Sequence, residues 1–159
     1  MTDTPPLNDG PALTRFLEAR YHMRHREQLP VLAVMAAKVE LAHAGHPNVP
    51  SGLAPLLRRL DAELTLHMRK EELILFPAIR AGEGTAMAQP IAVMRSDHAD
   101  HERALEAVLR ITGDLELPAD ACATWTRLYV DLKEFMSDFS EHLRLENDVL
   151  FPMFEPTQQ

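Results

Sequence analysis

Apolar residues recur at helical spacing along this chain, with steps that alternate between four and three residues. Such a rhythm is typical of the buried stripe of an amphipathic helix. Two long stripes share it: Leu53, Leu57, Leu60, Leu64, His67, Glu71 and Ile74 form the first, and Leu128, Leu132, Phe135, Phe139, His142, Glu146 and Val149 form the second. Each stripe carries a histidine and a glutamate where an apolar residue is expected, so we expect these polar side chains to face the core.

Proline and glycine separate the stripes and predict where the helices begin and end. They interrupt the chain at 44–50, 82–84 and 117–118. We expect four helices, over about 12–44, 51–79, 90–113 and from the third break to about 151, with Ser51 capping the second. Pro30 lies inside the first helix and is expected to bend it. The prediction is an all-α, antiparallel up-down four-helix bundle over 12–154, preceded by a flexible lead-in over 1–11.

The polar positions of the two stripes form a motif that occurs twice. His67 precedes Glu71 by four residues, and His142 precedes Glu146 by the same spacing, and both copies then run into Leu-Phe-Pro. Residues four apart lie on one face of a helix, so an imidazole nitrogen and a carboxylate oxygen can reach one point. A buried carboxylate is costly unless it is paired or protonated. Two of them on facing helices favour a shared metal site.

The first and third helices each add a pair of histidines. His22 and His25 are three residues apart, as are His98 and His101. His22 and His98 each precede the motif histidine of the following helix by 44 or 45 residues. We therefore expect two helical hairpins related by an approximate two-fold axis, with a histidine from every helix at one level of the core. His25 and His101 stay open between metal ligand, partner of a ligand and solvent-facing residue.

Imidazoles and carboxylates together predict a mixed nitrogen–oxygen metal site. Two glutamates on facing helices can each bridge two metals, which lie ~3.5–4 Å apart in such paired sites. Iron is the preferred metal, with manganese and zinc open. Three carboxylates lie four residues before a motif or first-helix histidine and are candidates to accept the hydrogen bond of its outer N–H; these are Glu18, Glu63 and Asp138.

Composition and charge narrow the possible functions. The chain has 159 residues, of which 46% are apolar and 25% charged, as in one ordinary globular domain. A formal net charge of −8 argues against nucleic acid or an anionic membrane as a partner. The start of the chain lacks a secretory signal and no apolar run approaches a membrane span, so a cytoplasmic location is expected. The single cysteine, Cys122, is interpreted as a small buried residue, with thiol chemistry as an alternative.

The chain resembles the hemerythrin-like di-iron proteins, and more narrowly the RIC (repair of iron centers) family of iron–sulfur cluster repair proteins. The motifs that carry this resemblance extend from about residue 12 onward: Arg20-Tyr-His22-x-x-His25, Lys38-Val-Glu40-x-x-His43, His67-x-x-x-Glu71, Pro90-Ile-x-Val-Met-x-Ser-x-His98, Ala121-Cys-x-Thr-Trp125 and His142-x-x-x-Glu146. The resemblance implies a bacterial cytoplasmic protein with two iron ions in an oxo- or hydroxo-bridged centre. The ligands that it implies are His22, His67, Glu71, His98, His142 and Glu146.

The same resemblance implies a function. It points to the repair of iron–sulfur clusters damaged by nitric oxide or oxidants, with iron supplied to iron–sulfur proteins as acceptors. The alternatives are a hemerythrin-like protein that binds or senses dioxygen or nitric oxide, and a di-iron oxidase or peroxidase. Oxygen-carrying hemerythrins have a further histidine where this chain has Glu102, and ferritin-like oxidases use Glu-x-x-His pairs. The family also usually has a paired-cysteine domain ahead of the bundle, whereas this chain starts at the bundle.

His43 is the one residue on which the family pattern and helix geometry disagree. A histidine at this position is often counted among the family's important residues. It lies 21 residues past His22, which corresponds to roughly 31 Å along a continuous helix. We therefore expect His43 to lie outside the metal site.

Overall fold

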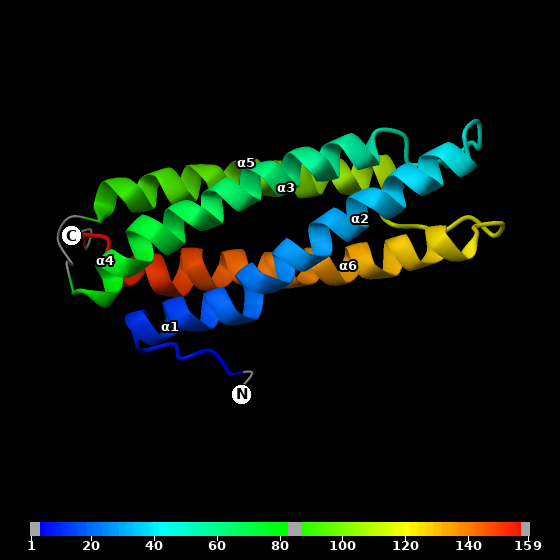
Figure 1. Cartoon of the computed structure of the whole chain (residues 1–159). Helices are drawn as coiled ribbons and strands as arrows, with labels where there is room; N and C mark the ends of the chain where they lie inside the picture. The colour runs from blue at the N-terminus through cyan, green and yellow to red at the C-terminus, as the bar shows by residue number, and fades with distance from the viewer. Residues whose placement is uncertain (1–3, 83–86, 157–159) are drawn as a thin grey trace.

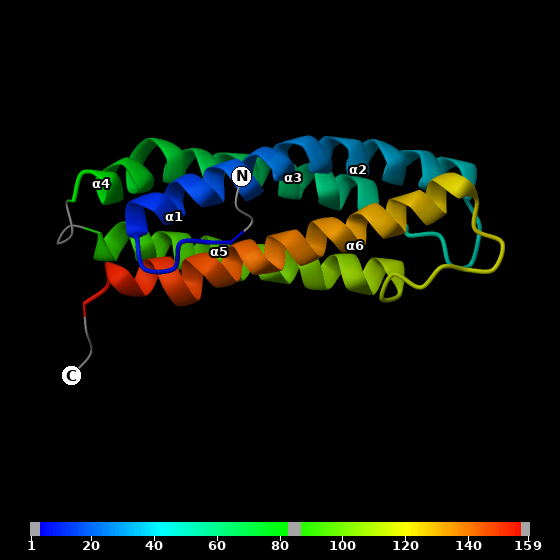
Figure 2. The same ribbon diagram turned by 90° about the horizontal axis from the view of Figure 1, so that it is seen from below.

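Four long helical segments lie side by side and form one bundle (Figures 1 and 2). The computed structural model describes residues 4–82 and 87–156, and within these ranges all regular structure is helical. Consecutive segments run in opposite directions, and Figure 2 shows α2 and α3 above α5 and α6. The predicted all-α antiparallel bundle is confirmed. Of the predicted connection at 82–84, residues 83 and 84 lie outside the described residues.

The first hairpin consists of two segments, each containing one π-helical turn. In order these are α1 (Gly10–Leu17), the π turn Glu18–His22 and α2 (Met23–Ala42), followed by α3 (Leu53–Lys70), the π turn Glu71–Leu75 and α4 (Phe76–Arg80). Helix α1 begins two residues before the expected start, with Asp9 as its N-cap. Pro30 lies inside α2, and the helix continues through it to Ala42.

The cap of α3 differs from the prediction. Gly52, and not Ser51, is the N-cap, with a left-handed φ of 91° that disfavours other residues. Glycine has no side chain that could accept a hydrogen bond from the start of the helix, so Glu40 of α2 supplies the acceptor. The Glu40 carboxylate accepts hydrogen bonds from the backbone N–H of Gly52 at 2.7 Å and of Ala54 at 2.9 Å. A negative charge at this helix start is also favourable for the α3 dipole.

The second hairpin consists of α5 (Ala88–Thr112) and a last segment that contains the third π turn. This segment comprises α6 (Ala123–Arg144), the π turn Leu145–Leu150 and a short 3₁₀ turn over Phe151–Met153. The C-cap of α5 is Gly113, which adopts a left-handed conformation with φ 59°. The N-cap of α6 is Cys122, whose sulfur accepts a hydrogen bond from the backbone N–H of Trp125.

The π turns change which residues face the core after each motif. A regular α-helix would place Phe76 about 140° round from Glu71 and so outside the stripe. The extra residue of the π turn brings Phe76 inside beside Leu75, where both are buried, and leaves Ile74 64% exposed. The expected burial of Ile74 is therefore wrong. The second copy behaves alike, because Leu150 and Phe151 are buried and Val149 is only half-buried.

The core has two apolar parts with a polar layer between them. We call the first the apolar half; it contains the buried residues of α2, α3, α6 and the end of α5, among them Leu32, Leu60, Val108 and Phe135. The second closes the end of the bundle where α1, α4 and the C-terminal turn meet. Along each of the four segments, buried histidines or glutamates separate these two parts. The fold thus brings the polar positions of all four helices to one level.

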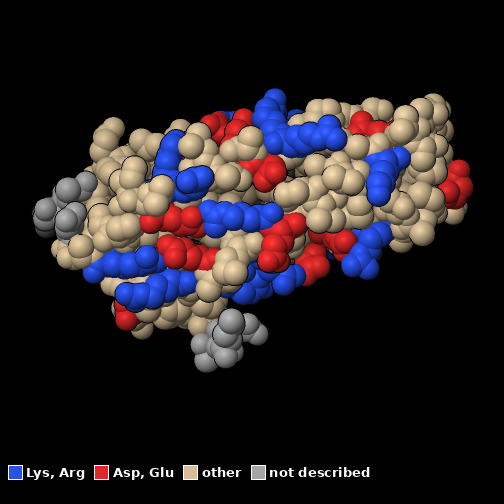
Figure 3. Space-filling view, in the orientation of Figure 1, with Lys and Arg blue, Asp and Glu red and all other residues tan. Residues whose placement is uncertain are grey.

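The surface carries charges of both signs. Figure 3 shows Lys and Arg interleaved with Asp and Glu along the visible face of the bundle. Some of these charges join neighbouring segments; Arg24 of α2, for example, lies 3.0 Å from Asp138 of α6. None of the helices in the described part of the chain is long and apolar enough to cross a membrane.

Candidate metal centre

Four histidines and two glutamates meet in the polar layer, and all six are buried. Their ligand atoms form two overlapping groups, in each of which every atom lies within 4.8 Å of the others; the groups are His22, Glu71, His142 and Glu146, and His67, Glu71, His98 and Glu146. The six residues expected at the metal site are thus brought together. Both groups contain both glutamates, which is the arrangement that two bridging carboxylates require.

Each glutamate lies between histidines from two different helices. Glu71 Oε1 is 3.3 Å from His22 Nε2 and 3.5 Å from His67 Nε2. Glu146 Oε1 is 2.9 Å from His98 Nε2, and its Oε2 is 3.1 Å from His142 Nε2. The four imidazoles therefore all direct Nε2 toward the two carboxylates at the centre of the layer.

Several polar atoms at this centre have no partner within the described residues. Both carboxylate oxygens of Glu71 and the Nε2 of His22 are buried and make no hydrogen bond. A buried carboxylate without a hydrogen bond carries a large desolvation penalty. A metal cation would accept these lone pairs and neutralise the charge. The donor set of imidazoles and carboxylates therefore fits a cation of the iron, manganese or zinc type.

The outer nitrogen of each histidine is held by a residue from a neighbouring helix. His22 Nδ1 lies 2.7 Å from Glu72 Oε2, and His98 Nδ1 lies 2.7 Å from Asn147 Oδ1. Glu72 and Asn147 each follow directly after a central glutamate, so the two hairpins use the same relative position. These contacts fix the ring orientation and leave Nε2 for the centre.

The other two outer contacts come from Asp97, which precedes His98, and from His25, three residues after His22. His67 Nδ1 lies 2.9 Å from Asp97 Oδ2, and His142 Nδ1 lies 3.1 Å from His25 Nε2. With these contacts, each helical segment binds the outer nitrogen of a histidine from one neighbouring segment, and its own histidine is bound by the other neighbour. The four contacts form a closed ring around the bundle, which we call the outer ring. His25 is thereby resolved as the partner of His142.

The carboxylates proposed from spacing do not take part in the outer ring. Glu18 lies 2.8 Å from Arg80, Glu63 contacts Arg59 at 3.9 Å, and Asp138 binds Arg20 and Arg24; all are ion pairs toward the surface. That interpretation is wrong because the outer nitrogens point sideways between helices, not along their own helix. The missed residues Glu72, Asp97 and Asn147 had one signal in the sequence, which is that each adjoins a central glutamate or histidine.

Electrostatics distinguish the two glutamates when no metal is bound. Burial and the negative charge of Glu146 raise the pKa of Glu71 well above its ordinary value. Burial would also raise the pKa of Glu146, but the charges and hydrogen bonds of His142 and His98 outweigh it and lower that pKa well below its ordinary value. The metal-free site therefore favours a protonated Glu71 beside an ionised Glu146.

Most histidines of the layer stay neutral without metal. Burial lowers the pKa of His25 to about 2 and the pKa values of His67 and His101 to about 4. Burial also lowers the pKa of His142. His98 differs from these four, because Glu146 outweighs the effect of burial and raises the pKa of His98. Neutral imidazole is the form that binds a metal, so burial prepares these side chains as ligands.

The remaining candidates fall outside the two groups. His101 is buried, and its ring centroid lies 5.1 Å from that of His67, edge to face. Glu102 is exposed and does not face the centre. His43 contacts Cys122 and Trp125 at the far end of the apolar half, as the length of α2 requires.

A helical bundle with buried histidines and glutamates shared between two groups defines a cation-binding helical domain. Residues 17–154 match the hemerythrin HHE cation binding domain, and the chain belongs to this family. The resemblance expected from the motifs is confirmed by relatives named iron-sulfur cluster repair protein YtfE. The chain is 48% identical to the YtfE protein of Musicola paradisiaca over 147 residues. It is 50% identical to the YtfE protein of Citrobacter koseri over 133 residues and 45% identical to the YtfE protein of Cronobacter sakazakii over 157 residues.

These alignments cover most of the chain but only part of the relatives. They include 92%, 84% and 96% of this chain and 65%, 60% and 71% of the respective relatives. The chain therefore spans about two thirds or less of the length of most of them. A function named for the whole relative does not transfer with the bundle alone.

Proposed function

We propose that this chain holds two iron ions in the polar layer and supplies iron for the repair of damaged iron–sulfur clusters. The observation that carries the proposal is that both four-residue groups contain Glu71 and Glu146. In this assignment His22 and His142 would hold one iron, His67 and His98 would hold the other, and both ions would share Glu71 and Glu146. The names of the relatives support cluster repair as the use to which such a centre is put.

Iron supplies a Lewis-acidic cation that changes between ferric and ferrous states and so changes how strongly oxygen ligands hold it. The chain's own residues orient the ligands through the outer ring and exclude water by the apolar parts above and below the layer. The same ligands can also contact each other, since Nε2 of His98 and Nε2 of His142 lie 2.9 and 3.1 Å from Glu146 oxygens. The Glu146 part of the emptied site therefore retains favourable contacts after a metal leaves, which suits the release of iron.

The acceptors in this proposal are iron–sulfur proteins that have lost iron to nitric oxide or oxidants, and the place of action is the cytoplasm. The experiment loads the purified chain with iron anaerobically, counts the bound metal and then reduces it. A ferrous chelator of moderate strength or a cluster-depleted iron–sulfur protein is added, and iron transfer is followed over time. We expect about two irons per chain and fast transfer after reduction.

A matched pair of variants makes this test specific. Glu146→Ala removes a shared carboxylate, whereas Glu63→Ala removes an exposed one from the same bundle. The first should lose iron and transfer, and the second should keep both. Binding that levels off at one iron and is unchanged in Glu146→Ala would contradict the paired site.

Reversible binding of dioxygen or nitric oxide is the second candidate function. It is favoured by His101, which lies beside His67 and whose buried Nδ1 makes no hydrogen bond within the described residues. A small polar ligand near His67 could use this nitrogen. The reduced iron-loaded chain is exposed to oxygen and then degassed; an adduct that forms and reverses, together with slow iron release, would favour this function over repair.

A further inference from the structure

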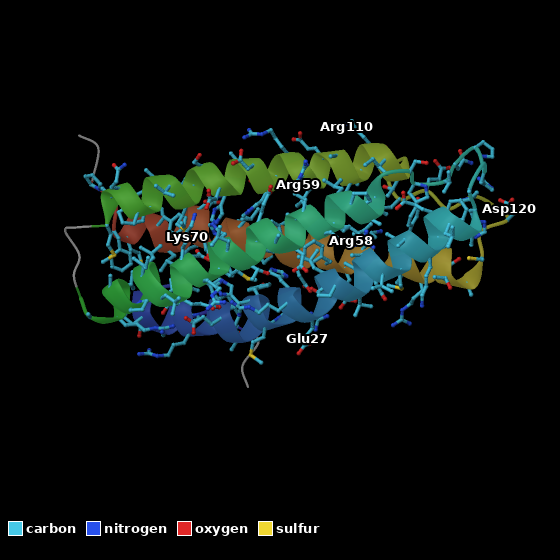
Figure 4. The ribbon with its side chains drawn as sticks, turned by 45° about the horizontal axis from the view of Figure 1, so that its top comes forward. Glu27, Arg58, Arg59, Lys70, Arg110 and Asp120 are labelled. Atoms are coloured by element: carbon cyan, nitrogen blue, oxygen red, sulfur yellow. The ribbon has the colours of Figure 1, made fainter. Side chains whose placement is uncertain are left out.

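The one cysteine of the chain lies against a histidine at the end of the bundle that carries the loops 43–52 and 113–122. Cys122 is the N-cap of α6, and His43 is the C-cap of α2. In Figure 4 the label of Asp120 marks this end, while Lys70, next to Glu71, marks the level of the metal centre. The pair is thus remote from the residues that the proposed function uses.

The thiol and the imidazole are in direct contact. Cys122 Sγ lies 3.2 Å from His43 Nε2, which is within hydrogen-bond distance for sulfur. The ring of His43 packs on Trp125, with centroids 4.7 Å apart, and Trp125 is fully buried. The imidazole is therefore held in place against a rigid surface, and its Nε2 is directed at the sulfur.

Helix capping alone does not require a cysteine at this position. Ser, Thr, Asp and Asn are the preferred N-caps, because their oxygens accept backbone N–H groups better than sulfur does. Here the cap contact from Trp125 N to Cys122 Sγ is 3.4 Å long. A serine would cap α6 equally well, so capping leaves the thiol and its histidine contact unexplained.

The two helix ends favour opposite charges on the two side chains. The N-terminus of a helix stabilises a negative charge, and the C-terminus stabilises a positive one. Cys122 lies at the first of these ends in α6, and His43 lies at the second in α2. The arrangement therefore favours movement of a proton from sulfur to imidazole when the thiol reacts. Cys122 is half-buried, so a small reagent can reach it.

We propose that Cys122 and His43 form a reactive thiol–imidazole pair that takes up low-molecular-weight disulfides as a mixed disulfide on Cys122. The S–H bond breaks and its proton goes to His43 Nε2 while Sγ attacks one sulfur of the disulfide. The disulfide S–S bond breaks, and the departing thiolate takes the proton from His43. The products are one protein mixed disulfide and one small thiol, with no other oxidant or reductant.

Removal of this mixed disulfide needs a thiol from outside the 159 residues. Cys122 is the one cysteine among these 159 residues, so none of them can resolve the mixed disulfide. The modification therefore persists until an external thiol removes it. Cys122 would in this way record the ratio of oxidised to reduced small thiols, independently of whether iron occupies the metal centre.

The test measures the rate at which the folded chain releases thiopyridone from 4,4′-dithiodipyridine at neutral pH. The reference thiol is a synthetic peptide of residues 118–126, which has the same local sequence and no histidine. His43→Gln removes the base, and His46→Gln is the matched control, because His46 bonds Asp120 at 3.0 Å rather than the sulfur. Cys122→Ser, which retains a cap, gives the background, and intact mass spectrometry after treatment with oxidised glutathione identifies the adduct.

We expect the native thiol to react at least about tenfold faster than the peptide, despite its partial burial. His43→Gln should lower the rate by about tenfold or more, and His46→Gln should leave it near that of the unmodified chain. A native thiol that reacts no faster than the peptide would overturn the proposal, whether or not His43→Gln folds. An equally fast reaction in folded His43→Gln, checked by circular dichroism, would also overturn it.

Discussion

The apolar half of the bundle and the polar layer are built on the same four segments, but burial has opposite effects in them. In the apolar half, each buried Leu or Phe side chain stabilises the fold by about 1.5–3 kcal/mol. In the polar layer, Glu71 is buried without a hydrogen bond within the described residues, which opposes folding. The comparison shows that the apolar half supplies the stability that lets the layer hold its ligands ready before a cation arrives.

Substitution in the apolar half should have the largest effect. Leu60 is 1% exposed, and Leu60→Ala should lower the free energy of unfolding by about 2–5 kcal/mol, because it leaves a cavity. The loss should be equal in the metal-free and iron-loaded chains, measured by urea denaturation. Leu66→Ala on the same helix is the control, since Leu66 is 57% exposed and should change stability by less than about 0.5 kcal/mol. A loss confined to one metal state would mean that the two regions are not separable.

The two glutamates of the layer should differ from each other in the metal-free chain. Glu146→Gln should lower the free energy of unfolding by about 1.5–3 kcal/mol, because it removes an ionised partner of His98 and His142. Glu71→Gln should lower it by less than about 1 kcal/mol, since glutamine resembles the protonated carboxyl that the raised pKa of Glu71 favours. Both variants should lose iron. Equal losses of metal-free stability would contradict the assigned charge states.

The polar layer should also make metal-free stability depend on pH. His25, His67 and His101, with pKa values lowered to about 2, 4 and 4, stay neutral in the folded chain but take up protons near pH 6.5 when unfolded. The unfolded chain then binds more protons, so stability falls as pH drops below 6.5. The raised pKa values of Glu71 and His98 act in the opposite direction.

With His142, whose pKa is also lowered, four lowered histidines outweigh two raised groups, so stability should fall between pH 7 and pH 5. The melting temperature of the metal-free chain, followed by circular dichroism across this range, measures this fall. Leu60→Ala should lower every melting temperature without changing the pH dependence, whereas His101→Leu should reduce that dependence. A melting temperature that rises toward pH 5 would show that these histidines are protonated in the folded chain.

Loss of an outer-ring contact should have a smaller effect, confined to the metal-bound state. Asn147→Ala leaves His98 Nδ1 without its partner at 2.7 Å and should weaken iron retention about tenfold, as measured by competition with a chelator. Metal-free stability should change little, because Asn147 lies at the edge of the layer. Glu63→Gln serves as the control, and equal retention in both variants would argue against a role for the outer ring.

Substitution of His43 should have no effect on metal binding. His43→Ala should leave the iron content unchanged, because His43 lies beside Cys122, at the far end of the apolar half. Elemental analysis after anaerobic loading, beside His67→Ala, provides the measurement. If His43→Ala lost as much iron as His67→Ala, the separation between the metal centre and the loop end of the bundle would be wrong.

Sequence periodicity was sufficient to predict the bundle and to predict that six polar residues lie at one level of the core. Those residues occupy stripe positions, so their direction follows from helix geometry alone. The change in which residues face the core at each π turn was not predictable in this way. A π turn contains one residue more than an α-helical turn, and the apolar run Ile-Leu-Phe is compatible with either. The partners of the imidazoles were missed for another reason. Contacts such as His22 with Glu72 join different helices, and their choice depends on how the helices rotate against each other.

The contact of His43 with Cys122 could not be predicted from the sequence for the same reason. The two residues are 79 positions apart in the sequence and meet only because the ends of α2 and α6 coincide. Helix length correctly separates His43 from His22 and does not indicate which residue His43 contacts instead. Spacing within one helix therefore predicts how far a side chain can reach better than it predicts the partner that the side chain meets there.

The outer ring has a consequence for how the four segments are aligned along the bundle axis. Leucine stripes alone tolerate sliding, because one apolar side chain can replace another after a shift of one turn, about 5.4 Å. The ring does not, since moving any one segment by a turn would break the contact that it makes and the contact that it receives. Each helix is therefore positioned by two neighbours at once. The four contacts around the imidazoles therefore fix the axial register of the entire bundle.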